Sequence, residues 1–323
     1  QGTGRLAVVF LFDESGSLQF TDVEGRRVDA ALTALDSLAV LAGGSDDQQL
    51  AVDVTLGTFS DDYRPEGQWF TLDDTNLPTI RRFMEGLRNR NKGKETDFLT
   101  ALDGARDTLA TRTAEITAEG GEAPCKAILF FTDGAEYKLT QRTPENQATL
   151  DATKRYAPGV DLSTPEGIVA AERAGRAEMC REGGSADQVR ADDISMITVS
   201  LFSGEQVGDA DFLPAISTGS SGELTCGKPS DTATGTYLVA DDVDTLITSF
   251  DEIATRLAGG TLVDFEGAVP TLCTEVCPDG TRTVEVDPTV RRIRVLALAP
   301  EPGITVTIDG PAGSLVIDEA GMA

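Results

Sequence analysis

The chain has 323 residues, of which 40% are hydrophobic, so it can form a folded core and disorder is not expected. Its 54 acidic and 27 basic residues give a formal charge of −27, and this field repels nucleic-acid backbones and anionic membrane surfaces. Histidine is absent, which excludes serine–histidine and cysteine–histidine nucleophile pairs and the usual zinc ligand sets.

Apolar runs alternate with helical patterns along the first 259 residues. Continuous apolar runs predict strands that are buried on both faces, and apolar residues three and four apart predict helices. In chain order the predicted elements are strand 6–12, helix 28–41, strand 50–59, helix 77–87, helix 98–109, strand 127–132, strand 194–202, strand 236–239 and helix 243–257. This order predicts an α/β domain over residues 1–259 with a doubly wound, mostly parallel sheet.

Two further regions depart from that pattern. A long insertion over 135–193 follows the strand at 127–132 and contains a helical stretch at 164–180. We interpret the insertion as a lid or recognition element, with a solvated excursion that makes no contacts as the alternative. After Gly259 and Gly260, short alternating runs and turn sequences predict a small, all-β, sandwich-like unit over 260–323.

Oxygen-bearing side chains follow the first predicted strand. The segment Asp-Glu-Ser-Gly-Ser at 13–17 places one carboxylate and two hydroxyls in a tight turn. The turn lies at the carboxyl end of a central strand, where ligand sites occur in such sheets. Hydroxyl, carboxylate and water oxygens suit a hard cation such as Mg²⁺ or Mn²⁺. For this segment taken alone, an ordinary strand–helix turn with a helix cap is the alternative.

Several motifs together resemble the von Willebrand factor A family over roughly residues 5–259. They are the 13–17 segment, the Thr96-Asp97 step that begins a helix, Phe-Thr-Asp-Gly at 131–134, and the strand and helix at 235–259. The resemblance implies a metal-ion-dependent adhesion site with Ser15, Ser17 and Thr96 as direct ligands, and with Asp13 and Asp133 acting through water. It also implies Mg²⁺, or Mn²⁺ or Ca²⁺, with one coordination position open to a carboxylate of a partner.

Other acidic residues lie beside these positions. We expect Asp97 to cap the helix that begins after it, because negative charge is favourable at a helix N-terminus. Glu136 is expected at a solvated rim, with an approach to the ion as the alternative. Asp61 and Asp62 follow a strand end and form either a turn or a second cation site, and the turn is our default prediction.

The five cysteines are widely spaced, and without histidine they form no zinc pattern. Disulfides are the better interpretation if the protein is exported, and Cys180 with Cys226 is the pair that we expect. Cys125 is the third candidate for that bond, or else a buried thiol. Cys273 and Cys277 can close a small loop, and an odd count leaves at least one thiol unpaired within the chain.

These observations lead to a binding function rather than an enzyme. The leading hypothesis is a divalent-cation-dependent adhesion or protein-binding module outside a bacterial cell, with a partner protein that presents Asp or Glu to the metal. No nucleic-acid partner is expected, and no stretch approaches the roughly 20 apolar residues that span a bilayer. The first residues lack a leader pattern, as expected of a mature or trimmed terminus. The alternative is an accessory subunit of an intracellular ATPase or chelatase machine.

Overall fold

The computed structural model describes residues 4–43, 50–133, 137–201, 211–228, 235–239, 306–310 and 313–317. The chain divides into two compact units, residues 1–262 and 263–323. The predicted closing helix at 243–257 and the predicted strands around 283–286 and 292–298 lie outside the described residues. In the second unit, β10 (Val306–Gly310) and β11 (Gly313–Ile317) pair as an antiparallel hairpin. The sandwich-like unit itself stays a prediction.

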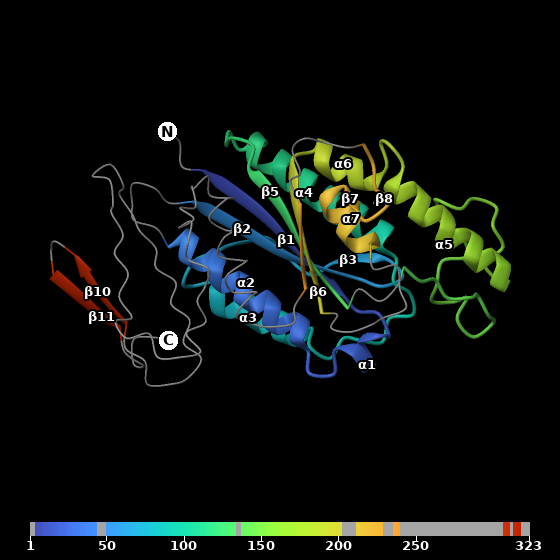
Figure 1. Ribbon diagram of the computed structural model, residues 1–323, viewed down its shortest axis with the longest axis horizontal. Coiled ribbons are helices and arrows are strands. Elements are labelled where there is room, and N and C mark those ends of the chain that lie inside the picture. The colour runs from blue at the N-terminus through green and yellow to red at the C-terminus, as the bar shows by residue number, and fades with distance from the viewer. Residues whose placement is uncertain are drawn as a thin grey trace. The chain divides into compact units, whose positions relative to one another are not determined.

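A mostly parallel sheet forms the centre of the first unit (Figure 1). Within the described residues its strands are β1 (Arg5–Asp13), β2 (Ala51–Phe59), β3 (Tyr63–Pro65), β4 (Phe70–Thr71), β5 (Cys125–Thr132), β6 (Ile194–Ser200) and β9 (Thr236–Val239). The strand order is β3-β2-β1-β5-β6-β9, and β4 also pairs with β2. β1 lies in parallel between β2 and β5, whereas β3 and β4 run antiparallel to β2.

Helices cover both faces of this sheet. The helices of the described residues are α1 (Leu18–Thr21), α2 (Arg26–Ala42), α3 (Leu77–Gly86), α4 (Phe98–Ala118), α5 (Pro165–Cys180), α6 (Ser185–Ala191) and α7 (Phe212–Thr218). A small hairpin of β7 (Ser220–Ser221) and β8 (Leu224–Thr225) follows α7. Figure 1 shows α2 and α3 on one side of the sheet, and α4 and α6 on the other. None of the described helices is both long and apolar enough to cross a membrane.

The side chains of β1 point alternately to the two faces of the sheet, which explains why residues 6–12 are all apolar. Val8, Phe10 and Phe12 belong to the core cluster that includes α2 and α3. Val9 and Leu11 belong to the other cluster, which includes α4. Because both faces are covered, neither set of alternate positions meets solvent. The doubly wound, mostly parallel α/β fold predicted from the sequence is therefore confirmed.

Helix α4 is longer than the sequence predicted. It continues beyond residue 109 to Ala118, where the only further buried residue is Ile116. Thr113 and Thr117 in this last part donate their hydroxyls to the carbonyls of Leu109 and Thr113, four residues earlier. Threonine has a low helix propensity, which is why the pattern appeared to end early. The predicted helix at 164–180 is present as α5, with the Thr164 side chain as its N-cap.

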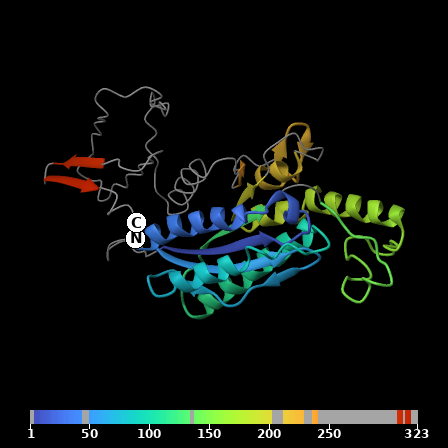
Figure 2. The ribbon, with the colours of Figure 1, turned by 90° about the horizontal axis from the view of Figure 1, so that it is seen from below.

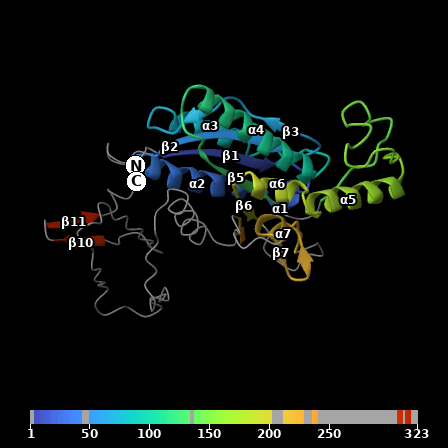
Figure 3. The same cartoon turned by 90° about the horizontal axis from the view of Figure 1, so that it is seen from above.

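The insertion is folded and has a small core of its own. Its apolar cluster contains Leu139, Ala157, Leu162, Ile168 and Ala171. In Figure 2, α5 and the loops that precede it extend beyond one end of the sheet. Figure 3 shows α1, which follows the end of β1, at that same end. The insertion therefore lies near the edge where the sequence predicts a ligand site.

Candidate metal centre

The predicted centre begins at the carboxyl end of β1. Asp13 is the last residue of the strand and is fully buried. One of its carboxylate oxygens accepts the Ser15 N–H at 2.7 Å, and the other accepts the Thr132 hydroxyl at 2.7 Å. The turn that follows brings the hydroxyl oxygens of Ser15 and Ser17 to 3.0 Å from each other. The two serine hydroxyls thus converge beside a fixed, buried carboxylate.

Asp133 joins this edge from the neighbouring strand. β5 pairs in parallel with β1, with Phe131 opposite Phe12, so both strands end at the same edge. Asp133 is 1% exposed, and one of its carboxylate oxygens accepts the hydroxyl of Thr21 in α1 at 2.7 Å. Burial, and then the negative charge of Asp133, raise the pKa of Asp13 to about 7. Two buried carboxylates therefore repel each other here, and a bound cation relieves that repulsion.

Thr96 reaches the edge on a loop that is held by the ends of β1 and β2. The N–H of Gly93 donates to the Glu14 carbonyl at 2.8 Å, and the Ser60 hydroxyl donates to the Glu95 carbonyl at 2.8 Å. Thr96 itself is buried, with 6% of its surface exposed. A Cβ on Gly93 would lie 2.1 Å from the Ser60 hydroxyl oxygen and 2.7 Å from the Glu14 carbonyl oxygen. Only glycine allows the loop to approach this closely.

The donor set at this edge suits a hard divalent cation. Two carboxylates and three hydroxyls come from the five predicted positions, and oxygen donors of this kind are what Mg²⁺, Mn²⁺ and Ca²⁺ select. In the described part of the chain, no three acidic, histidine or cysteine side chains gather as a metal site. A cation site here must therefore depend on hydroxyl ligands. The chemistry of the residues fits the predicted ion, and the ligand roles themselves stay predictions.

The insertion packs against the Thr96 loop through buried polar groups. Asp97 caps α4, as predicted, by accepting the Thr100 N–H at 3.2 Å. It also accepts the hydroxyls of Tyr137 at 3.1 Å and Tyr156 at 2.7 Å, both from the insertion. Burial and the adjacent Asp97 charge raise the pKa of Tyr137 above its ordinary value, so its hydroxyl stays protonated and donates. A solvated excursion without contacts is thus the wrong interpretation of the insertion.

Sequence reasoning missed the charged members of this contact. Lys154 and Arg142 of the insertion are 3% and 7% exposed, and both pair with Glu95. A lysine and an arginine in a polar loop give no periodic signal, and each is normally assigned to the surface. The pairing of these charges can be recognised only in the folded structure, where the insertion packs on residues 94–97.

Comparison with known proteins agrees with the motifs over part of the chain. The model of the von Willebrand factor type A domain matches residues 8–136. That segment is therefore similar to this domain family. All five predicted metal ligands lie within it, whereas most of the insertion does not. No curated protein matches the chain by sequence.

Several solved structures resemble the chain in three dimensions. A von Willebrand factor type A protein from Catenulispora acidiphila is 15% identical, with a TM-score of 0.45 over 81% of this chain and 45% of its own. The PilB minor pilin from Streptococcus sanguinis is 17% identical, with a TM-score of 0.47 over 80% of this chain and 62% of its own. The pilus adhesin SpaC from Lactobacillus rhamnosus GG is 15% identical, with a TM-score of 0.47 over 80% of this chain and 30% of its own. The chain thus spans less than two thirds of each.

Three other acidic residues near the predicted centre have local partners. Asp62 accepts the N–H of Tyr63 at 2.8 Å, and Asp61 pairs with Arg64 at 3.5 Å, so these residues form a turn, as our default prediction had it. Glu14 lies 2.5 Å from Arg90, and burial raises the pKa of Glu14 above its ordinary value. Glu136 lies outside the described residues.

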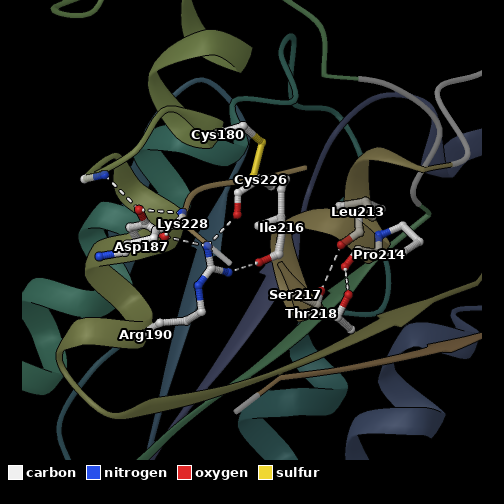
Figure 4. Close-up of a disulfide and its surroundings, with 11 residues drawn as sticks. Cys180, Asp187, Arg190, Leu213, Pro214, Ile216, Ser217, Thr218, Cys226 and Lys228 are labelled. Atoms are coloured by element: carbon white, nitrogen blue, oxygen red, sulfur yellow. Dashed lines mark hydrogen bonds and ion pairs between the residues drawn. A yellow bond between two sulfur atoms is a disulfide. The ribbon is translucent and has the colours of Figure 1, made fainter. Parts of the chain in front are cut away.

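The cysteine predictions have mixed outcomes. Cys180 at the end of α5 forms the expected disulfide with Cys226, 46 residues further along the chain (Figure 4). Cys125 is free and exposed, so the expectation of a buried thiol is wrong. It is the first residue of β5, where the strand has not yet entered the core. Cys273 and Cys277 lie outside the described residues.

Proposed function

We propose that the chain is a divalent-cation-dependent protein-binding module of the adhesion type. The observation that carries this proposal is the convergence of the Ser15 and Ser17 hydroxyls, 3.0 Å apart, beside the buried Asp13. In the proposal these serines and Thr96 bind the cation directly, and Asp13 and Asp133 hold it through water. Few direct anionic ligands leave the ion strongly electrophilic, and a partner's Asp or Glu completes its coordination.

The proposed location is outside the cytoplasm, and the proposed role is binding without catalysis. The Cys180–Cys226 disulfide supports this location because such bonds persist in oxidising compartments and are rare in the cytosol. The same bond weighs against an accessory subunit of an intracellular ATPase machine. Absence of histidine from the chain removes the commonest general base, so a binding role needs the fewest assumptions.

Calorimetric titration with Mn²⁺ and Mg²⁺ tests the cation. The wild-type chain is expected to bind one ion, and Asp13→Asn and Thr96→Ala are expected to weaken that binding at least about tenfold, as loss of a ligand or its anchor does. Asp62→Asn is the matched control, because Asp62 is exposed on a nearby turn and its side chain accepts the N–H of the adjacent Tyr63. A wild-type chain that takes up neither ion contradicts the proposal.

Water-proton relaxation of the Mn²⁺-loaded chain tests the open coordination position. Acetate stands in for the partner's carboxylate, so it is expected to displace a water from the ion and lower the relaxivity. Chloride at the same concentration controls for ionic strength. If acetate leaves the relaxivity of a fully loaded sample unchanged, the ion has no position that a carboxylate can enter.

A further inference from the structure

The ammonium group of Lys154 lies in a buried cage of oxygen atoms. Its Nζ is 2.7 Å from Glu95 Oε2 and 2.9 Å from Asp97 Oδ2, and it donates to the Asp61 carbonyl at 2.9 Å. The side chain is only 3% exposed. An ammonium group has three N–H donors, and three oxygen atoms lie close to this one, two of them from carboxylates that compensate its buried charge. Two carboxylate oxygens and one carbonyl oxygen are ligands that a bound cation would also take, and here the ammonium group of Lys154 occupies their centre.

The oxygens of this cage belong to the predicted metal edge. Glu95 immediately precedes Thr96 in the loop, and Asp97 immediately follows it. Asp61 follows Ser60, whose hydroxyl donates a hydrogen bond to the Glu95 carbonyl of the same loop. The backbone of Thr96 is held as well, because its N–H donates to the Lys138 carbonyl at 2.7 Å. The insertion therefore contacts the loop at Glu95, at Asp97 and at the backbone of Thr96 between them.

Charge is balanced within this contact. Glu95 and Asp97 are both buried, with 1% and 0% of their surfaces exposed. Arg142 pairs with the second oxygen of Glu95, and Lys154 pairs with both acids. Without Lys154, the two carboxylates would face each other in a site shielded from water. Their repulsion would move them apart or draw water in, and Thr96 lies between them.

We propose that Lys154 is a built-in cation that positions Thr96, so that the insertion is an integral part of the metal centre. This inference rests on the proposed function, since it concerns the geometry of that same site. By neutralising Glu95 and Asp97, the ammonium also keeps these carboxylates away from the divalent ion. The ion then retains few anionic ligands, and its open position stays available to a partner.

The first test compares two neighbouring charge removals in the full chain. Lys154→Met keeps most of the aliphatic stem and removes the ammonium, and Mn²⁺ affinity is expected to fall roughly 10–100-fold, as for loss of other outer-shell groups. Arg155→Met is the matched control, because its side chain is 63% exposed and its ion pair with Asp103 lies outside the Glu95–Asp97 contact. Wild-type affinity is expected for the control. Wild-type affinity in Lys154→Met overturns the inference.

Chemical rescue separates positioning from a general loss of packing. Lys154→Ala removes the propylammonium part of the side chain, so added propylammonium is expected to restore part of the Mn²⁺ affinity. Tetramethylammonium, which donates no hydrogen bond, is expected to restore none. Equal effects of the two ions, or no rescue by either, contradict an internal cation at this position.

Two further measurements keep the outcome unambiguous. Circular dichroism checks the fold of each variant, and the double variant Glu95→Gln/Lys154→Met replaces any single variant that fails to fold, because it removes an acid and a base together. Wild-type Mn²⁺ affinity in that double variant overturns the inference. Absence of Mn²⁺ binding to the wild-type chain overturns the proposed function instead, since Lys154 is unchanged there.

Discussion

The Cys180–Cys226 disulfide is expected to make a large, measurable contribution to stability. It closes a loop between residues 46 apart, and the chain-entropy relation gives about 4 kcal/mol for a loop of that length at 25 °C. Replacement of both cysteines in the double variant Cys180→Ser/Cys226→Ser is expected to lower the free energy of unfolding by up to this amount. Most of the effect arises in the unfolded chain, which gains conformational freedom when the bond is absent.

The folded structure is expected to persist without the bond, because hydrogen bonds hold the same segments (Figure 4). Arg190 of α6 donates to the Cys226 carbonyl at 2.6 Å and to the Ile216 carbonyl at 3.3 Å. The carboxylate of Asp187 accepts the N–H of Lys228 at 2.8 Å. The segment that carries Cys226 is thus tied to α6 independently of the sulfur atoms. Loss of stability without loss of the native fold is the expected result.

Urea unfolding followed by tryptophan fluorescence measures the change. Trp69 is the single tryptophan of the chain, and the Arg112 guanidinium lies 5.7 Å from its ring centroid, so its emission reports on the first unit. With an m-value of about 3 kcal/mol/M, the double variant is expected to unfold at a urea concentration about 1 M lower. Cys125→Ser is the control, because this exposed thiol forms no bridge. A midpoint for the double variant that equals the control refutes the chain-entropy reasoning.

Three further predictions concern the metal edge. The pKa of Asp13 is raised to about 7, and a cation binds the charged form of this carboxyl. Mn²⁺ affinity measured by calorimetry should therefore fall as pH drops below 7, by up to about tenfold per pH unit. A flat profile of affinity between about pH 5 and 8 would show that Asp13 does not titrate there. An unfolded aspartate has a lower pKa, about 3.9, so the metal-free chain should lose thermal stability as pH rises from about 4 to 7. A contribution of Asp13 that instead raises the melting temperature over this range, judged against Asp13→Asn, would contradict this. Gly93→Ala, whose Cβ would meet the Ser60 hydroxyl oxygen at 2.1 Å, should weaken Mn²⁺ binding at least about tenfold, whereas Gly86→Ala, with nothing within 4 Å, should not.

The main fold could be predicted because its sheet is buried on both faces. The covered stretches of β1 and β5, residues 6–12 and 127–131, are apolar at every position, and that signal needs no knowledge of what packs on them. The short edge strands β3 and β4, at 63–65 and 70–71, were not predicted, because two or three residues carry no periodicity. Helix α7 was missed for the same reason, since it spans only Phe212–Thr218.

The candidate site was predictable where its residues follow strand ends. Asp13 and Asp133 come at or directly after buried strands, and parallel strands end at one edge, so their proximity follows from the fold. The role of the insertion did not follow, because its contacts join residues far apart in the sequence, such as Lys154 and Glu95. No local pattern encodes such a pairing, and a polar loop gives no apolar stripe that would reveal its docking face.

The buried charges between the insertion and the Thr96 loop bear more on geometry than on net stability. Removing paired charges from water costs about as much as their attraction returns, and well-packed apolar residues often stabilise a fold as well or better. Glu95 and Asp97, however, are paired by several groups of the insertion together, among them Arg142, Lys154 and Tyr156. Such directional polar contacts define the placement of the insertion more narrowly than an apolar contact of the same size would. An Mg²⁺ site accepts ligand distances only near about 2.1 Å, so a hydroxyl on a loop serves such an ion only if the loop is fixed with comparable precision.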